Sequence, residues 1–214
     1  MKKLLEKTTL VGLSLFTFGL SFAQKIDQKS QSILDAVTSN YKSKKNTYFK
    51  FTYGSGSGKV TKAETGIFYS SNDKYKLKIM GIEQIFDGSK VYNINDSDKE
   101  VTIAKPNDSD VMFSPLSYLE SYKKDYNVTY VGKRNVSGKS LDYIKMTPVK
   151  ENGLSQVNLY VNSAQNKLVK LEQIATNNQL ATISISDYKE NQNLSSNVFS
   201  FDKAKYAKYL ITEL

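Results

Sequence analysis

The 214-residue sequence contains no cysteine and no histidine. Without histidine, the chain lacks the usual general base of Ser/His/Asp and Cys/His sites and the commonest zinc ligand. Without cysteine, no disulfide can stabilise the fold, so stability has to come from apolar burial and strand pairing. These absences weigh strongly against triad hydrolases and zinc enzymes, and we expect no catalytic residue, no metal site and no cofactor.

Long apolar runs are also scarce. The one candidate, residues 10–23, is shorter than the ~20 residues of a membrane-spanning helix. Three lysines precede it, and Ser21-Phe22-Ala23 places small residues at a cleavage site, a layout typical of a secretory signal peptide. We expect residues 1–23 to be cleaved, with an uncleaved anchor as the alternative, and residues 24–214 to form one exported domain. No cysteine follows the cleavage site to carry a lipid anchor.

Acidic residues are the minority among the charges: 21 Asp and Glu against 30 Lys and Arg give a formal net charge of +9. The lysines are dispersed and the chain is expected to leave the cytoplasm, so nucleic acid is disfavoured as a partner. A soluble surface with some attraction to anionic membranes or partners is the simpler interpretation. The carboxylates show no spacing that singles out a glycosidase pair.

The spacing of apolar residues predicts two helices. The first covers residues 26–45 and has a period near 3.6. The second begins at Ser114-Pro115, because proline is favoured at the first helical position. The apolar positions assigned to these helices are Ile33, Leu34, Val37, Leu116 and Leu119.

A period of two predicts strands elsewhere. They begin at Thr47 and continue at residues 64–71, 74–80, 83–87, 91–95, 100–104, 127–133, 141–148, 155–161, 167–175 and 180–189. Residues 54–58 (GSGSG) predict a hairpin loop, Asp87-Gly88 a tight turn, and residues 202–210 a short helix. Consecutive strands favour an antiparallel meander. We therefore expect a mainly β fold with α, in which a strongly curved sheet or half-barrel has its concave face covered by the helices.

The clearest strand is KYKLKI, residues 74–79, in which Tyr75, Leu77 and Ile79 alternate with three lysines. The lysine row is interpreted as a solvated face, with contact to lipid headgroups or an anionic partner as the alternative. The apolar strand residues that could line a cavity, or simply fill a core, are Phe49, Phe51, Tyr75, Leu77, Ile79, Ile85, Ile183 and Ile185.

The order of these elements resembles the LolA family of lipoprotein localisation factors. The likeness is centred on residues 64–95, ETGIFYSSNDKYKLKIMGIEQIFDGSKVYNIN. The matching pieces are Gly66-Ile67-Phe68, Tyr75-Lys76-Leu77, Ile85-Phe86-Asp87-Gly88 with Lys90, Val91-Tyr92, Ser114-Pro115-Leu116 and Phe199-Ser200-Phe201. The resemblance extends over nearly the whole chain after residue 23.

The resemblance implies an eleven-stranded half-barrel whose apolar cavity shields the acyl chains of a lipoprotein crossing the periplasm. It implies a monomeric, non-enzymatic carrier that receives cargo from an inner-membrane lipoprotein-releasing transporter and passes it to an outer-membrane acceptor. The family often has Arg-Pro before the aromatic-led strand, and that arginine latches the helical lid. Here the positions are Ser71-Asn72. A carrier of another apolar molecule and an exported scaffold or interaction module remain alternatives.

Overall fold

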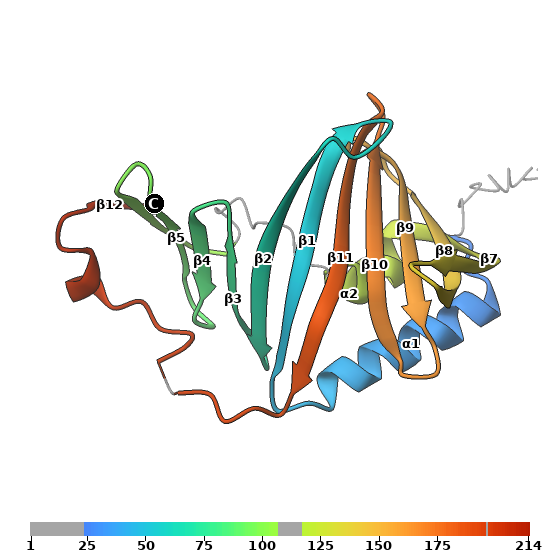
Figure 1. Ribbon diagram of the computed structural model, residues 1–214, viewed down its shortest axis with the longest axis horizontal. Coiled ribbons are helices and arrows are strands. Elements are labelled where there is room, and N and C mark those ends of the chain that lie inside the picture. The colour runs from blue at the N-terminus through green and yellow to red at the C-terminus, as the bar shows by residue number, and fades with distance from the viewer. Residues whose placement is uncertain (1–23, 107–116, 196) are drawn as a thin grey trace, which may run out of the picture.

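The computed structural model describes residues 24–106, 117–195 and 197–214, and one curved sheet is its main element (Figure 1). The helices are α1 (Gln28–Lys42), α2 (Ser117–Asp125) and the 3-10 helix η1 (Lys203–Tyr206). The strands are β1 (Thr47–Ser57), β2 (Lys62–Ser71), β3 (Lys74–Ile79), β4 (Ile82–Phe86), β5 (Val91–Asn95), β6 (Glu100–Ala104), β7 (Tyr126–Val136), β8 (Lys139–Pro148), β9 (Leu154–Asn162), β10 (Lys167–Ala175), β11 (Gln179–Glu190) and β12 (Leu210–Glu213). The predicted signal peptide, the Ser114-Pro115 helix start and Leu116 lie outside the described residues.

The twelve strands form a single sheet in the order β12-β6-β5-β4-β3-β2-β1-β11-β10-β9-β8-β7. The pairs are antiparallel except β12 with β6. Two meanders of consecutive strands meet where β1 pairs with β11, and this pairing places Phe51 opposite Ile185 and Tyr53 opposite Ile183. In the described part of the chain β7 and β12 remain as separate edges, so the sheet is an open half-barrel. The predicted curved antiparallel sheet is confirmed, with twelve strands rather than eleven.

Helix α1 begins later than the apolar period predicts. Asp27 caps it, since its Oδ1 accepts a hydrogen bond from the Ser30 backbone N–H at 2.9 Å and so satisfies one of the free donors of the first turn. Ile26 lies before the cap and forms a parallel β-bridge with Val128 of β7. This bridge covers the start of that edge strand, because it uses backbone groups that an exposed edge would leave unpaired.

The helices cover the half of the concave face formed by β7–β10. Leu34 and Val37 of α1 have no exposed surface, and Leu119 and Tyr122 of α2 are almost as deeply buried. They pack on inward-facing residues of the sheet, among them Ile144, Val157, Leu159 and Leu171. Full burial of one Leu or Val side chain contributes about 1.5–3 kcal/mol, so α1 is held mainly by its apolar face.

Two local predictions are wrong. The glycine run 54–58 is mostly strand, because β1 continues to Ser57. Glycine is required there by close approach: a Cβ on Gly56 would lie 2.9 Å from the Thr61 backbone nitrogen. At the C-terminus, the predicted helix over residues 202–210 is reduced to the four residues of η1, and the chain then adds β12 to the sheet.

Candidate functional site

An apolar cluster, most of it buried, continues from the helix-covered core across β11, β1, β2 and β3. We call it the concave wall; its residues are Phe49, Phe51, Phe68, Tyr75, Leu77, Ile79, Ile183 and Ile185. Seven of the eight predicted cavity residues belong to it. Strand register explains why: Tyr75, Leu77 and Ile79 alternate with the lysines of β3, and Leu77 lies opposite Phe68. Ile185 also contacts the cluster beneath the helices, so the two apolar regions adjoin.

Ile85 is not part of the concave wall, and its predicted place there is wrong. The two-residue turn at Met80-Gly81 pairs Ile79 with Ile82, which places Ile85 opposite Lys76 on the other face. There Ile85 packs with Ile94 and Val101. Successive side chains of a strand point to opposite faces. The neighbours of Ile85, which are Gln84 and Phe86, therefore face the concave side and lie opposite Leu77 and Tyr75.

Aromatic rings form a continuous row on the concave wall and beyond it. Phe49 stacks on Phe68 with centroids 5.0 Å apart, and Phe68 stacks on Tyr75 at 6.2 Å. Tyr188 extends the row on one side at 5.9 Å from Phe49, and Phe86 extends it on the other at 5.7 Å from Tyr75. Sequence reasoning missed Phe68, Tyr188 and Phe86, although period-two alternation within residues 64–71 would have indicated Phe68.

A short series of side-chain hydrogen bonds crosses β3, β4 and β5 at the edge of the concave wall, on the same face of the sheet. The Tyr75 hydroxyl donates to Gln84 Oε1 at 2.9 Å, and Gln84 Nε2 donates to Asn93 Oδ1 at 2.5 Å. Burial raises the pKa of Tyr75 to about 12. Gln84 is completely buried, and a buried amide is tolerated when its hydrogen bonds are satisfied.

The predicted lid helices contact each other through Asp35 of α1. Its Oδ1 accepts a hydrogen bond from the Tyr122 hydroxyl at 2.7 Å and lies 2.7 Å from Lys123 Nζ. Ile33, Leu34 and Val37 from α1 and Leu119 from α2 all face the cluster over β7–β10. The helices therefore form one layer over that half of the sheet, beside the concave wall.

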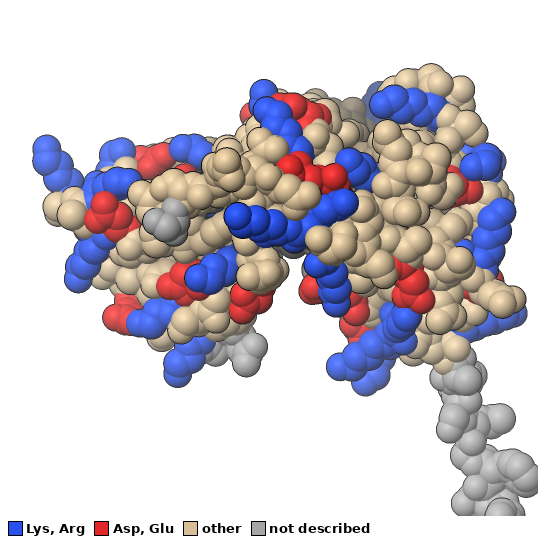
Figure 2. Space-filling model, turned by 90° about the horizontal axis from the view of Figure 1, so that it is seen from below, with Lys and Arg blue, Asp and Glu red and all other residues tan. Residues whose placement is uncertain are grey.

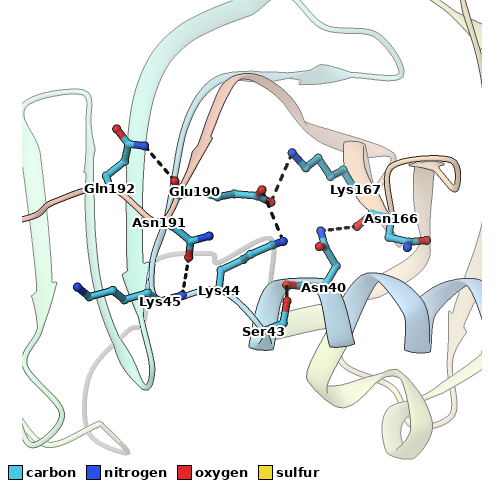
Figure 3. A network of polar contacts seen from close by, with 9 residues as sticks. All are labelled: Asn40, Ser43, Lys44, Lys45, Asn166, Lys167, Glu190, Asn191 and Gln192. Atoms are coloured by element: carbon cyan, nitrogen blue, oxygen red, sulfur yellow. Dashed lines mark hydrogen bonds and ion pairs between the residues drawn. The ribbon is translucent and has the colours of Figure 1, made fainter.

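Polar contacts fix the segment after α1 to the end of β11 (Figure 3). The Glu190 carboxylate lies 3.7 Å from Lys44 and 3.4 Å from Lys167. The Lys45 backbone N–H donates to Asn191 Oδ1 at 2.9 Å. The Asn46 side chain also exchanges two hydrogen bonds with the Gln192 backbone, at 2.7 and 2.9 Å. These last contacts join residues 146 positions apart and restrain the C-terminal end of α1.

Ser71, at the predicted latch position, lies beside this segment. Its hydroxyl donates to the Lys45 carbonyl at 2.9 Å. The hydroxyl therefore connects the β2–β3 turn to the chain that follows α1. A neutral side-chain hydrogen bond contributes about 0.5–1.5 kcal/mol, less than a charge-assisted arginine pair would.

A cavity of about 320 Å³ opens at this end of the sheet, and we call it the mouth cavity. It is bounded by the end of α1, by Leu119 and Glu120 of α2, and by residues 70–73 around the β2–β3 turn. Its floor continues the concave wall, because Thr47 and Ser70 are paired on the same face as Phe49 and Phe68. Seen from this end, the molecular surface is hollowed by a notch between two lobes, and charged side chains border it (Figure 2).

The lysine row of β3 lies on the opposite face of the sheet. Lys76 and Lys78 share the carboxylate of Glu83 at 2.8 and 3.9 Å. They line a second cavity of about 490 Å³ between the sheet and residues 197–206. Farther along this face, an aromatic group that includes Tyr92 and Phe201 joins the C-terminal segment to β4–β6.

The described residues contain no group of three or more Asp and Glu side chains arranged to hold a metal ion. Within the same part of the chain, no helix has both the length and the apolar character needed to span a bilayer.

A model of the family described as "Outer membrane lipoprotein carrier protein LolA" matches residues 47–202. The chain belongs to the LolA family. The match contains the concave wall, the mouth cavity's turn and the Ser71 position. No curated protein sequence matches the chain.

Solved structures resemble the chain at low sequence identity. An uncharacterized conserved protein from Thermus thermophilus is 11% identical, with a TM-score of 0.63, and the match covers 87% of this chain and 100% of that one. This likeness shows a shared fold. A LolA superfamily protein from Nitrosomonas europaea is 11% identical, with a TM-score of 0.42 and coverages of 81% and 98%. The Mycobacterium tuberculosis lipoprotein LppX is 11% identical, with a TM-score of 0.48 and coverages of 79% and 98%.

Proposed function

We propose that the protein is a non-enzymatic periplasmic carrier that binds the acyl chains of lipoproteins and delivers them to the outer membrane. The observation that carries the proposal is the concave wall, a largely buried apolar face of eight residues that adjoins the open mouth cavity. Membership of the LolA family and the expected export signal support it. A donor transporter in the inner membrane and an acceptor at the outer membrane are the partners that this role requires.

The energetics of acyl chains explain why such a carrier is needed. Each methylene removed from water gains about 0.8 kcal/mol, so a lipid with several chains does not cross an aqueous compartment unaided. A carrier has to present an apolar surface of matching length while the rest of its surface stays polar. Six of the eight residues of the concave wall are buried in this structure, so the wall supplies the first feature once it opens to cargo. The lysines of β3 on the opposite face supply the second feature.

Cavity size predicts that cargo binding moves the helices. Sites for drug-sized ligands have volumes of about 300–1,000 Å³, and the mouth cavity, at about 320 Å³, is at the lower end of that range. A lipid with several acyl chains therefore requires the layer formed by α1 and α2 to separate from part of the sheet. The Ser71 and Glu190 contacts at the end of α1 restrain this movement.

Native mass spectrometry of the purified mature protein tests the proposal. We expect a one-to-one complex with a triacylated lipopeptide and no complex with the same peptide lacking acyl chains. Binding of other lipids in place of the lipopeptide would keep the carrier and change its cargo. Absence of all lipid binding would favour an exported scaffold or interaction module.

A further inference from the structure

Two tyrosine hydroxyl groups are buried where the helix-covered cluster meets the concave wall. They belong to Tyr41 of α1 and Tyr188 of β11, whose ring centroids lie 5.9 Å apart. Among the residues that the structure describes, no atom completes a hydrogen bond with either hydroxyl. A buried hydroxyl without a partner is costly, so two adjacent ones call for an explanation.

The tyrosine pair adjoins three regions of the molecule. Tyr188 extends the aromatic row of the wall, since its ring stacks on Phe49 at 5.9 Å. Tyr41 packs against the cluster beneath the helices and also lines the mouth cavity. At the same place β1 changes from an aromatic to a polar inward-facing residue, from Phe49 to Thr47. The pair therefore lies at the border between the apolar wall and the polar opening.

Both hydroxyls remain protonated at neutral pH. Burial raises the pKa of each tyrosine above its ordinary value, and the negative charge of Glu190 raises it further. The Glu190 carboxylate itself is held by Lys44 and Lys167, at 3.7 and 3.4 Å. Each tyrosine is thus able to donate one hydrogen bond. A ligand that satisfies both needs acceptor atoms at the point where its apolar part ends.

We propose that the hydroxyls of Tyr41 and Tyr188 bind the ester carbonyls at the root of the cargo's acyl chains. In a triacylated lipopeptide two of the chains are joined through esters, whose carbonyl oxygens accept hydrogen bonds and donate none. The chains then lie on the concave wall, and the peptide leaves through the mouth cavity. This assignment rests on the proposed carrier function and adds recognition of the linkage between chain and peptide.

Movement of the helices makes the two donors available together with the wall. Tyr41 lies in the last turn of α1 and Tyr188 in the sheet, so separation of the helix layer from the sheet also separates their rings. The unpaired hydroxyls weaken the contact between α1 and the sheet in the protein without cargo. Ester carbonyls satisfy them only after the layer has moved, so the pair favours the loaded conformation.

Two lipopeptides with identical acyl chains test the assignment. One is triacylated through esters, and in the other both esters are replaced by ethers, whose oxygens are much weaker acceptors. Both are offered in equal amounts to the purified mature protein, and the bound forms are counted by native mass spectrometry. We expect the ester form to exceed the ether form by about three- to tenfold. Tyr41→Phe combined with Tyr188→Phe should abolish this preference.

Thermal unfolding of the protein without cargo distinguishes an unpaired hydroxyl from a paired one. Tyr41→Phe and Tyr188→Phe should each leave the melting temperature unchanged or raise it by about 2–4 °C. Tyr143→Phe is the matched control, because the Tyr143 hydroxyl donates to Asn158 Oδ1 at 3.1 Å. Tyr143 lies on the opposite face of the sheet from its neighbour Ile144, which packs beneath the helices. Its substitution should lower the melting temperature and leave the ester preference unchanged.

The outcomes separate this site from the carrier function. Equal binding of the ester and ether forms, or an ester preference that survives the double substitution, would overturn the site while leaving the carrier function intact. A melting temperature lowered by Tyr41→Phe or Tyr188→Phe would show that the hydroxyl is already bonded without cargo, and would overturn the site as well. If neither lipopeptide binds, the carrier function itself is contradicted, and the ester site with it.

Discussion

The ring of Phe51 lies directly over Gly66, its partner on the neighbouring strand. A Cβ placed on Gly66 would lie 2.8 Å from both Cε atoms of that ring. Phe51 in turn is only 3% exposed, so the ring cannot move away from a new methyl group without displacing the side chains that bury it. The glycine and the aromatic residue therefore form one packing unit at the centre of the concave wall.

Gly66→Ala should destabilise the protein by about 1–3 kcal/mol, the usual cost of forcing extra volume into a packed site. Urea unfolding measures this change in the free energy of unfolding. Phe51→Leu removes part of the ring that the new methyl group would meet. In a double-mutant cycle the two substitutions should therefore be less costly together than the sum of their separate effects. Additive effects would show that the ring does not depend on the glycine.

The two faces of the sheet should respond differently to loss of a buried side chain. Leu77 on the concave wall and Ile94 on the opposite face are 3% and 1% exposed. Leu77→Ala and Ile94→Ala should each cost about 2–5 kcal/mol in unfolding free energy. Only Leu77→Ala should also weaken lipid binding, measured by native mass spectrometry at a temperature where both variants are folded. Equal weakening by both would remove the distinction between the faces.

Loss of the Glu190 charge should loosen the end of α1. Glu190→Gln leaves Lys44 and Lys167 without their shared carboxylate, and the expected cost is about 1 kcal/mol or less. Hydrogen exchange should therefore accelerate in residues 40–46 with little change in β7–β9. Glu151→Gln, at an exposed residue between β8 and β9, is the control. Unchanged exchange at the end of α1 would show that the backbone contacts of Asn46 and Gln192 suffice.

Acid should destabilise the protein partly through Asp142. Burial would raise the pKa of Asp142, but hydrogen bonds from Ser163, Tyr130 and Lys133 lower it overall. A carboxyl group whose pKa is lower in the folded state contributes stability above its unfolded pKa of ~3.9, and this contribution is lost as the pH falls through the folded value.

Asp142→Asn should cost about 1–3 kcal/mol at pH 7, because the buried amide replaces an ionised acceptor of these bonds. It should also reduce the loss of stability between about pH 5 and pH 3, measured by urea unfolding at each pH. A pH dependence identical to that of the unsubstituted protein would show that other carboxylates, such as Asp27 and Asp87, account for it.

The sequence predicts the elements of this fold better than their register. Alternation within residues 74–79 places Tyr75, Leu77 and Ile79 on one face, and local sterics alone are enough for that inference. Ile85 was misplaced because its face depends on the length of the turn at Met80-Gly81, which moves every later residue of β4. The geometry of the mouth cavity could not be predicted from the sequence either, because it depends on contacts between residues more than a hundred positions apart.

Short edge elements were the least predictable part. β12 has four residues without a clear alternation, and it pairs in parallel with β6 after a segment whose Phe201 and Tyr206 pack on the sheet. Ile26 fits the helical period but lies in a β-bridge, because the Asp27 cap starts the helix after it. In both cases tertiary contacts outweigh local propensity.

Photochemical labelling tests the central claim, that acyl chains lie on the concave wall. A triacylated lipopeptide with a photoreactive diazirine at the end of one acyl chain is bound and irradiated, and the labelled peptides are mapped by mass spectrometry. We expect labels on inward-facing residues of β1, β2, β3 and β11, such as Phe49, Phe68 and Leu77. Labels concentrated on the opposite face, around Ile94, Tyr92 and Phe201, would contradict it.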